Sequence, residues 1–547
     1  MHLKVAKAIE SVYSERLSDF YGMLAFHYSA GGELKKAEDY LFKAAEQTFN
    51  SAASHEAINY LKEAIEFYVK IYGEKADPDK LFVLERNLGL AYYNKGYWND
   101  SLEHLKKALS YKGVVLEPGK LKETLRFGAD LVAVLNDLYF PSKRIKKVPD
   151  EDTNSVFDVL YKIASVTANF DAKKMFFELL HMLRMQTRYQ LQPKEGHASY
   201  AYASGIFSYS GLSFSLSRKF MQRASEYAIA GHLDSALKNS EHEVMLNFLN
   251  GDWKNIHDIN EEYVNERLRN GDLYAATLAI SWVIYVKNAQ GDLQRSIELI
   301  HKQEDIGEEF DSGYARLFSS NFTLDRHLAK RDLRAAVKAA DRTSGFAEQL
   351  GFESWLIGIL AKKTKVQVLS GDLDGAAVSI KKAGDVIAKL DKSKLAPMLT
   401  CYYLTYHFWY LVELLERKSK ARNEKFSTSE IRDLKKSALK AGVRAMKISR
   451  KVADVRVETY FLMGRYAWLV GDRRKAFRYW RKSAEFGERL RALPDVGRIY
   501  CEVGSKMLAD KLNRSDFLGL SGQDCLKKAV SIFHELELEH DLELIPH

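Results

Sequence analysis

Several stretches of the sequence contain residue types that could do chemistry. Gly504-Ser505-Lys506 has the glycine, hydroxyl and lysine that close a phosphate-binding loop, but no glycine stands at the upstream spacing that such a loop requires. The sequence has no GxGxxG after a strand pattern, no GxSxG and no HExxH, and no pair of aspartates like a cyclase metal site. An ordinary helix is the favoured interpretation of 504–506. We therefore expect a chain without catalytic residues, cofactors or enzyme activity.

The C-terminal stretch FHELELEHDLELIPH gathers imidazole and carboxylate groups, which are common metal ligands. An amphipathic terminal helix with an acidic face explains the same residues without a metal and is preferred, so no metal site is predicted. The same reasoning makes other histidines surface residues or residues of a seam between helices. The residues concerned are His534, Glu537, His540 and Asp541 in the tail, and His242-Glu243 and His301 elsewhere.

A helix over CYYLTYHFWYLVELL is aromatic on most sides. Tyr402, Tyr406 and Trp409 share one face, and a second face lies next to it. Burial between neighbouring helices is the preferred interpretation, and a groove with aromatic anchors is the alternative. The stretch 417–456 that follows is rich in Lys and Arg. A solvated outer face is the preferred interpretation, and a surface for nucleic acid or an acidic partner is the alternative. The candidate binding surface consists of Tyr403, His407, Tyr410, Lys436, Lys440 and Arg444.

The elements that would position these residues follow a repeat. Gly251-Asp252-Trp253, Gly291-Asp292-Leu293, Arg331-Asp332-Leu333 and Gly371-Asp372-Leu373 recur every forty residues. Glycine ends a helix in the left-handed conformation, and aspartate caps the next one. The triplets are therefore predicted to be turns inside four successive helical hairpins, and Gly271 to join two neighbouring hairpins. Arg331 replaces glycine, so we expect that turn to end differently.

Three further units have the small and large residues of a tetratricopeptide (TPR) hairpin, in which small residues stand where two antiparallel helices touch. Repeats of this period are typical of a solenoid. Each repeat would bury its apolar face only against its neighbours, so that stability accumulates along the array. The units are 81–111 with Gly89, Gly96, Ser101 and Ala108; 460–483 with Gly464, Gly471, Ala476 and Trp480; and 24–44 with Ala25, Tyr28, Ala37 and Leu41.

Composition agrees with an all-α chain. Of 547 residues, 46% are hydrophobic and only 8 are proline, which favours long uninterrupted helices. The net charge of +9 is modest for this length and gives no reason to expect nucleic acid. The longest apolar runs, such as 278–286, fall short of the ~20 residues that cross a bilayer, and the N-terminus lacks a signal-peptide core. We expect no membrane association and a cytoplasmic location, which the three widely spaced cysteines also suit.

The first ~145 residues resemble the segment that follows the ATPase module in STAND-type predicted signalling ATPases, which are often fused to class III adenylate or guanylate cyclases or to serine/threonine kinases. GVVLEPGKLKETL and LYFPSKR are also similar to passages of that family. The resemblance implies a TPR-type sensor region and a signalling ATPase or cyclase module as partner. It is carried by Val5, Ala6, Ile9, Glu10, Tyr13, Arg16, Leu17, Leu24, Ala25, His27, Tyr28, Gly32, Ala37, Tyr40, Leu41 and Ala44.

The predicted fold is all-α, a right-handed superhelical solenoid of TPR-like antiparallel helix hairpins. Its predicted units are 1–115, N-terminal repeats; 116–200, an irregular helical insertion with a helix from about Leu121 to Tyr139; 201–415, repeats of forty residues; and 429–547, C-terminal repeats and terminal helices. Residues 416–428 are expected to be a solvated loop or a frayed helix end, and Ser427 with Glu430 is expected to form a capping box for the next helix. The predicted function is a non-catalytic scaffold or sensor that binds a protein or ligand, as the C-terminal arm of a signalling ATPase. A free-standing TPR adaptor and an enzyme with an unrecognised site are the alternatives.

Overall fold

The computed structural model describes residues 1–50, 54–114, 116, 120–141, 146–231, 241–391, 395–420, 428–510 and 517–545. Within these residues the chain forms helices and two isolated β-bridges, without a strand of greater length. Ser427 and most of the predicted loop 416–428 lie outside the described residues. The expected helix from about Leu121 to Tyr139 is present as α7.

In chain order, the helices are α1 (His2–Val12), η1 (Ser14–Phe20), α2 (Tyr21–Ala30), α3 (Leu34–Asn50), α4 (Ser54–Tyr72), η2 (Gly73–Lys75), α5 (Pro78–Lys95), α6 (Trp98–Tyr111), α7 (Lys120–Tyr139), α8 (Glu151–Thr167), α9 (Ala172–Gln186), α10 (Pro193–Tyr209), α11 (Phe214–Ala230), α12 (Glu241–Asn250), η4 (Trp253–Asn255), α13 (Glu261–Arg269), α14 (Leu273–Gln290), α15 (Leu293–Glu309), α16 (Gly313–Lys330), α17 (Leu333–Gln349), α18 (Glu353–Leu369), α19 (Leu373–Lys389), α20 (Pro397–Lys420), α21 (Thr428–Ser449), α22 (Arg456–Leu469), α23 (Arg473–Leu490), α24 (Leu493–Ala509), α25 (Gly522–Glu535) and α26 (Glu539–Glu543).

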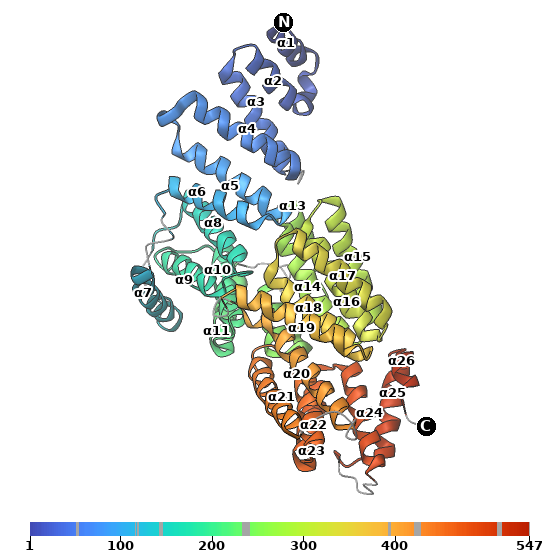
Figure 1. The fold of residues 1–547 in the computed structure, drawn as a ribbon. Coiled ribbons are helices and arrows are strands. Elements are labelled where there is room, and N and C mark those ends of the chain that lie inside the picture. The colour runs from blue at the N-terminus through green and yellow to red at the C-terminus, as the bar shows by residue number, and fades with distance from the viewer. Residues whose placement is uncertain are drawn as a thin grey trace.

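Most consecutive helices pair as antiparallel hairpins, and the hairpins stack in chain order, from the N-terminal end of the molecule to the C-terminal end (Figure 1). The pairs include α5 with α6, α16 with α17, α18 with α19, α22 with α23 and α24 with α25. The prediction of an all-α solenoid of antiparallel hairpins is confirmed.

The repeated turns have the predicted chemistry at three of the four positions. Gly291 ends α14 at φ 85°, and Asp292 accepts a hydrogen bond from the Arg295 amide at 3.3 Å at the start of α15. Gly371 adopts φ 77° between α18 and α19, and Asp372 caps α19 in the same way. Each turn therefore ends one helix and begins the next within three residues, which holds the two helices of a hairpin together.

The turn at Arg331 does not end differently, so that expectation was wrong. Arg331 adopts the left-handed conformation of the glycines, with φ 59°, and Asp332 accepts a hydrogen bond from the Ala335 amide at 3.1 Å. An L-residue in this conformation costs about 1–2 kcal/mol. The cap of α17 and the packing of the flanking helices hold the turn in spite of that cost.

The turn at Gly251 departs from the prediction, because no α-helix follows it directly. The indole of Trp253 stacks on Phe248 at 5.7 Å and donates a hydrogen bond to the Phe248 carbonyl at 2.9 Å. This contact folds the chain back as the 3₁₀ turn η4. The next helix, α13, starts only at Glu261, where Asn260 is the cap. Gly271 then joins α13 to α14 with φ 68°, so this linker turn lies between consecutive helices as expected.

Close packing inside the hairpins follows the predicted small residues. A Cβ atom on Gly89 of α5 would lie 2.7 Å from Cγ of Leu105 on α6, and Ser101 Oγ donates a hydrogen bond to the Gly89 carbonyl at 2.8 Å. A Cβ atom on Gly464 of α22 would lie 2.3 Å from Cδ1 of Trp480 on α23. Glycine lets each helix pair approach until the large side chain of the partner covers the gap.

The hairpins do not pack only against their neighbours, which corrects the expectation of purely local stability. Helices α5 and α24 both contact α14, although many hairpins separate them in the chain. Asn94 Nδ2 donates a hydrogen bond to the Gly271 carbonyl at 2.6 Å, and Gln290 Nε2 donates one to the Leu490 carbonyl at 3.2 Å across 200 residues. The superhelix is wound tightly enough for its successive turns to touch.

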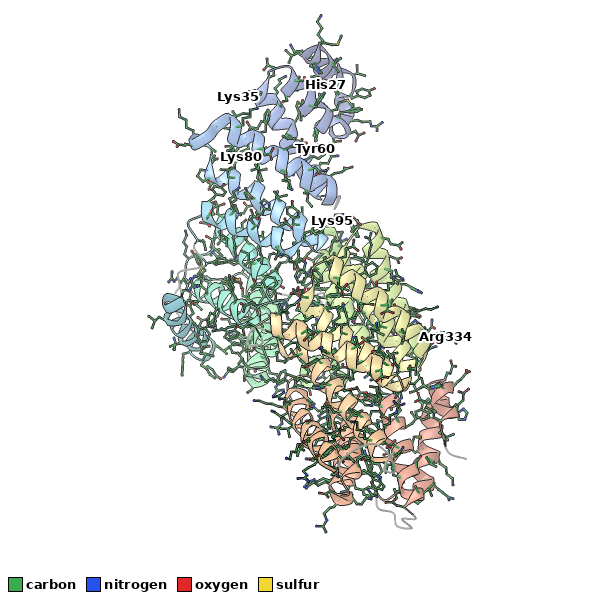
Figure 2. All side chains as sticks on the ribbon, in the orientation of Figure 1. His27, Lys35, Tyr60, Lys80, Lys95 and Arg334 are labelled. Atoms are coloured by element: carbon green, nitrogen blue, oxygen red, sulfur yellow. The ribbon has the colours of Figure 1, made fainter. Side chains whose placement is uncertain are left out.

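Side chains also join these turns. The indole of Trp98 on α6 lies 4.4 Å from the ring of Phe352 and 5.6 Å from that of Tyr274. The buried ammonium of Lys95 pairs with Asp311 where α5 meets the later hairpins, at the junction labelled in Figure 2. As a result, one continuous apolar core extends from Tyr93 of α5 and Trp98 of α6 to α25 and the turn that follows it.

The four predicted units remain a prediction, although two observations bear on them. The expected boundary at residue 200 falls inside α10, a continuous helix that pairs with α11. Helix α7 packs on α9 and stands at the side of the array in Figure 1, where the regular order of hairpins is interrupted. The interruption therefore lies at α7, and α8 to α10 belong to the stacked array.

Candidate functional site

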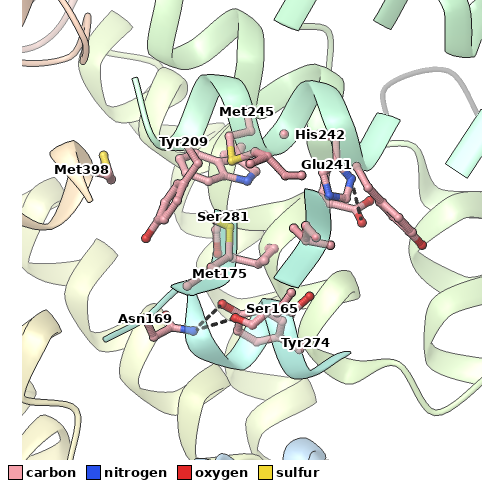
Figure 3. A pocket seen from close by; sticks show the side chains of 18 of the residues that line it. Ser165, Asn169, Met175, Tyr209, Glu241, His242, Met245, Tyr274, Ser281 and Met398 are labelled. Atoms are coloured by element: carbon pink, nitrogen blue, oxygen red, sulfur yellow. Dashed lines mark hydrogen bonds and ion pairs between the residues drawn. The ribbon is translucent and has the colours of Figure 1, made fainter. Parts of the chain in front are cut away.

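The two turns of the superhelix enclose an apolar cavity of about 110 Å³, here called the aromatic cavity. Helices α8, α9, α10 and α12 form one side, and α14, α16, α18 and α20 form the other. Figure 3 shows side chains from both sides converging on it. The lining residues that matter below are Tyr161, Ala168, Asn169, Met175, Tyr202, Tyr209, Glu241, His242, Tyr274, Tyr285, Trp355 and Met398.

Hydrogen bonds and stacking fix the walls of this cavity. Trp355 Nε1 on α18 donates to Asn169 Oδ1 at 3.0 Å, and Asn169 Nδ2 lies 3.4 Å from the Tyr274 hydroxyl on α14. The rings of Tyr161 on α8 and Tyr202 on α10 stack at 3.7 Å. Asn169 thus connects α8 to two helices of the later superhelical turn, so the cavity exists only while the two turns are in contact.

The polar groups of the aromatic cavity are mostly uncharged. Burial lowers the pKa of His242 and raises the pKa of Tyr274 to about 12, so both are neutral at physiological pH. Glu241 has an exposed fraction of 6%, and its side chain accepts a hydrogen bond from the Tyr263 hydroxyl. The arrangement suits an apolar group the size of one aromatic ring.

A second cavity of about 320 Å³, here called the polar cavity, adjoins the first. Tyr202, Glu241 and His242 line both. Four further lining residues each have a buried side-chain atom without a hydrogen-bond partner among the described residues. These atoms are Gln186 Oε1, Glu195 Oε2, His197 Nε2 and Arg267 Nε.

A third cavity, of about 280 Å³, is lined by Arg331, the residue in the turn that ends α16. Arg331 Nε lies 3.8 Å from Asp541 Oδ1, too far for a hydrogen bond, and the side chain is 12% exposed. Asp541 is held instead by Arg498, at 3.0 and 2.7 Å. Burial, with the charge of Arg498, lowers the pKa of Arg331 to about 10. Arg331 therefore extends from its turn toward the C-terminal helix α26.

The face of the aromatic helix α20 that was predicted to be buried points toward the cavities. Tyr402, Tyr406 and Trp409 are at most 6% exposed and line the cavities near α22 and α24. Lys362 lies over the ring of Tyr402 at 4.6 Å, and Tyr402 donates a hydrogen bond to Asp454 at 2.6 Å. Burial between neighbouring helices is the correct interpretation for this face.

The candidate binding surface lies on the neighbouring face of α20 and on α21, and it stays a prediction. Tyr403 and His407 are half-buried and stack at 5.6 Å, and burial lowers the pKa of His407, with a smaller effect from the charge of Arg444. Tyr410 is also half-buried. The exposed Lys436, Lys440 and Arg444 on α21 lie on the outer surface, where Lys436 is 3.8 Å from Asp433.

Sequence reasoning missed the residues of the aromatic and polar cavities. It assigned His242 to a surface or a seam, and His242 does lie in a seam, but it also lines both cavities. The stretch SYAYASGIFSY, which forms α10, alternates aromatic and small residues and was the one available signal. That pattern places tyrosines on α10, but it does not show which distant helices they meet.

No family model matches this sequence, and no curated protein matches it. Among solved structures, the chain is similar to a Rap protein complexed with Competence and Sporulation Factor, at 10% identity and a TM-score of 0.37, over 85% of this chain and 100% of that one. It is also similar to yeast Tom70, at 12% identity and a TM-score of 0.32, over 91% of this chain and 98% of that one. Scores this low carry no argument about ligand or partner, and the fold class rests on the helix contacts of the chain itself.

Across the described residues, no helix combines the length and the apolar character that crossing a bilayer requires. The same residues contain no group of three or more His, Cys, Asp or Glu side chains arranged to hold a metal ion. In the C-terminal tail, Asp541 is 4% exposed and paired with Arg498. Arg498 lies on α24, so this ion pair connects the terminal helix α26, which contains Asp541, to α24.

Proposed function

We propose that this chain is a non-catalytic receptor scaffold that takes a bulky apolar side chain of a partner polypeptide into its aromatic cavity. The observation that carries the proposal is that the walls of this cavity come from two successive turns of the superhelix. An occupant contacts both turns at once. Binding therefore shifts the chain toward the wound arrangement. The size of the shift is set by how much more tightly the occupant binds the wound arrangement than a looser one.

The setting we propose is a cytoplasmic sensor arm of a cyclase- or kinase-linked signalling ATPase. The resemblance of the first ~145 residues supports this setting. The contacts of Asn94 and Lys95 with the later turn support a route for the signal, since they connect the N-terminal hairpins to the helices around the cavity. Tightening of the wound arrangement would change how the N-terminal hairpins are held, and an ATPase partner would sense that change.

The ligand test uses 2-phenylethanol, a neutral probe with one aromatic ring, titrated by saturation-transfer NMR. Replacement of Ala168, which lines the aromatic cavity, by Phe fills the space. We expect saturable binding to the wild type and at least tenfold weaker binding to Ala168→Phe. The matched control Ala388→Phe adds the same side chain on the exposed face of α19 and should bind like the wild type. Equal binding by all three proteins would refute the proposed cavity.

The partner test isolates the chain from its native host after chemical cross-linking. We expect a polypeptide with a phosphate-binding ATPase loop, cross-linked to the hairpins α1 to α6. Deletion of residues 1–60 should then abolish the effect of ligand on the ATP turnover of that partner. A partner without ATPase motifs, or a ligand effect that survives the deletion, would contradict the proposed setting and leave the cavity proposal to be judged by the probe.

A further inference from the structure

We infer that the polar cavity beside the aromatic cavity binds a protonated amine, so that the ligand class is an apolar group carrying a cationic nitrogen. This inference rests on the proposed function, because the apolar part of the ligand is placed in the aromatic cavity. Three observations support it: unpartnered hydrogen-bonding atoms converge in the polar cavity, the charges of its lining favour a cation, and aromatic rings stand between the two cavities.

The unpartnered atoms of the polar cavity are mainly acceptors. Glu195 Oε2 can only accept while the carboxylate is ionised. His197 Nδ1 lies 3.1 Å from the Ala224 carbonyl, so Nδ1 carries the hydrogen and Nε2 offers a lone pair in the neutral ring. The side-chain oxygen of Gln186 adds a third acceptor. Buried acceptors of this kind are unfavourable when unpaired, and a ligand that donates several hydrogen bonds removes that penalty.

The charges of the polar cavity also favour a cation. Asp158, Glu195 and Glu241 contribute three carboxylates to its lining. Of its basic groups, Lys194 lies 3.4 Å from Glu266, and the charge of Arg267 acts chiefly on Glu241 and also on Asp272 at 3.9 Å. Asp158 also feels the charges of Lys162 and Arg86, and Glu241 has the charge of Arg267 acting on it. Glu195 is therefore the carboxylate that an ammonium group would meet.

The boundary between the two cavities has the chemistry that accepts an ammonium group next to a ring. Tyr202 and His242 line both cavities, and their rings are 4.9 Å apart. The faces of aromatic rings attract cations. A nitrogen two or three bonds from an aromatic ring would lie beside Tyr202 and His242, with the ring in the aromatic cavity and the N–H groups toward Glu195 and His197.

The test compares three probes of one shape, 2-phenylethylamine, 2-phenylethanol and 3-phenylpropanoate, which are cationic, neutral and anionic at neutral pH. Dissociation constants are measured for the wild type, for Glu195→Gln and for Glu308→Gln. The last variant removes an exposed carboxylate on α15 and serves as the matched control. We expect the amine to bind at least tenfold more tightly than the alcohol, and the acid to bind most weakly.

Glu195→Gln should reduce the preference for the amine to about twofold while the alcohol binds as before, and Glu308→Gln should keep the full preference. Equal binding of amine and alcohol by the wild type, or tighter binding of the acid, would overturn the inference while the aromatic cavity stands. An undiminished preference in Glu195→Gln would likewise overturn it. If none of the probes binds, the proposed function fails and this inference fails with it.

Discussion

Replacement of Trp98 by Ala tests whether successive turns of the superhelix stabilise each other. The side chain is 6% exposed. It packs on Tyr274 in the first turn of α14 and on Phe352, the residue before α18. Truncation of a buried tryptophan costs about 3–5 kcal/mol. We expect the lower end of this range, because Trp98 Nε1 has no hydrogen-bond partner among the described residues and its removal relieves that penalty.

Hydrogen exchange measured by mass spectrometry reads the effect region by region. Since 1.4 kcal/mol is a factor of ten, a loss of about 3 kcal/mol raises the opening equilibrium roughly a hundredfold. We expect faster exchange in the first turns of α14 and α18 as well as in α6. The control Leu61→Ala, at a 1% exposed position of α4, costs a comparable about 2–5 kcal/mol and should leave α14 and α18 unchanged.

If Trp98→Ala accelerates exchange only in α5 and α6, the contacts between superhelical turns carry no stabilising energy. The repeats would then be stabilised by their neighbours alone, as the sequence first suggested. The proposed coupling between ligand binding in the aromatic cavity and winding of the superhelix would then also fail, because the contacts between turns would not stabilise the wound arrangement.

Three further outcomes are expected. Gly464→Ala should lower the free energy of unfolding by about 1–3 kcal/mol, because its Cβ atom would lie 2.3 Å from Trp480, whereas Gly345→Ala on the exposed face of α17 should raise it by about 0.5–1 kcal/mol; thermal melts separate the two. Burial raises the pKa of Glu178 to about 7, above its ordinary 4.5, so the stability it contributes is complete below pH 4.5 and falls by about 1.4 kcal/mol per unit until pH 7. Urea denaturation at pH 5 and pH 7.5 should show this fall in the wild type and a flatter profile in Glu178→Gln. Arg331→Gly should raise the unfolding free energy by about 1 kcal/mol, because it removes left-handed strain and Asp541 keeps Arg498; a lower value would mean that the 3.8 Å contact stabilises the fold.

Local chemistry explains how much of this fold the sequence predicts. The turn triplets act within a few residues, since Gly291 ends one helix and Asp292 caps the next, so their pattern can be recognised in the chain. The same holds for Gly89 and Ser101 inside one hairpin. At Gly251 the prediction failed because Trp253 packs back onto Phe248, a choice that the triplet itself does not encode.

The cavities could not be predicted in the same way. Their walls depend on the small rotation between successive hairpins, which adds up along the array until distant helices meet. Trp355 reaches Asn169 across 186 residues, and no local pattern marks either residue as a partner of the other. Aromatic residues are dense on α20 and sparser on α8 and α10. The sequence pattern therefore points to α20, although it is α8 and α10 that face the later superhelical turn.

The contacts between superhelical turns join residues 177 to 216 positions apart, and this restricts how the chain can change length during evolution. Gln290 meets the Leu490 carbonyl across 200 residues and Arg456 meets the Asn250 carbonyl across 206, which corresponds to about five repeats of forty. Gain or loss of one hairpin between such partners would shift every later helix by one position and set the wrong surfaces against each other. Descendants of this protein should therefore vary in the lengths of their loops and at their ends, and keep the number of hairpins in each full turn.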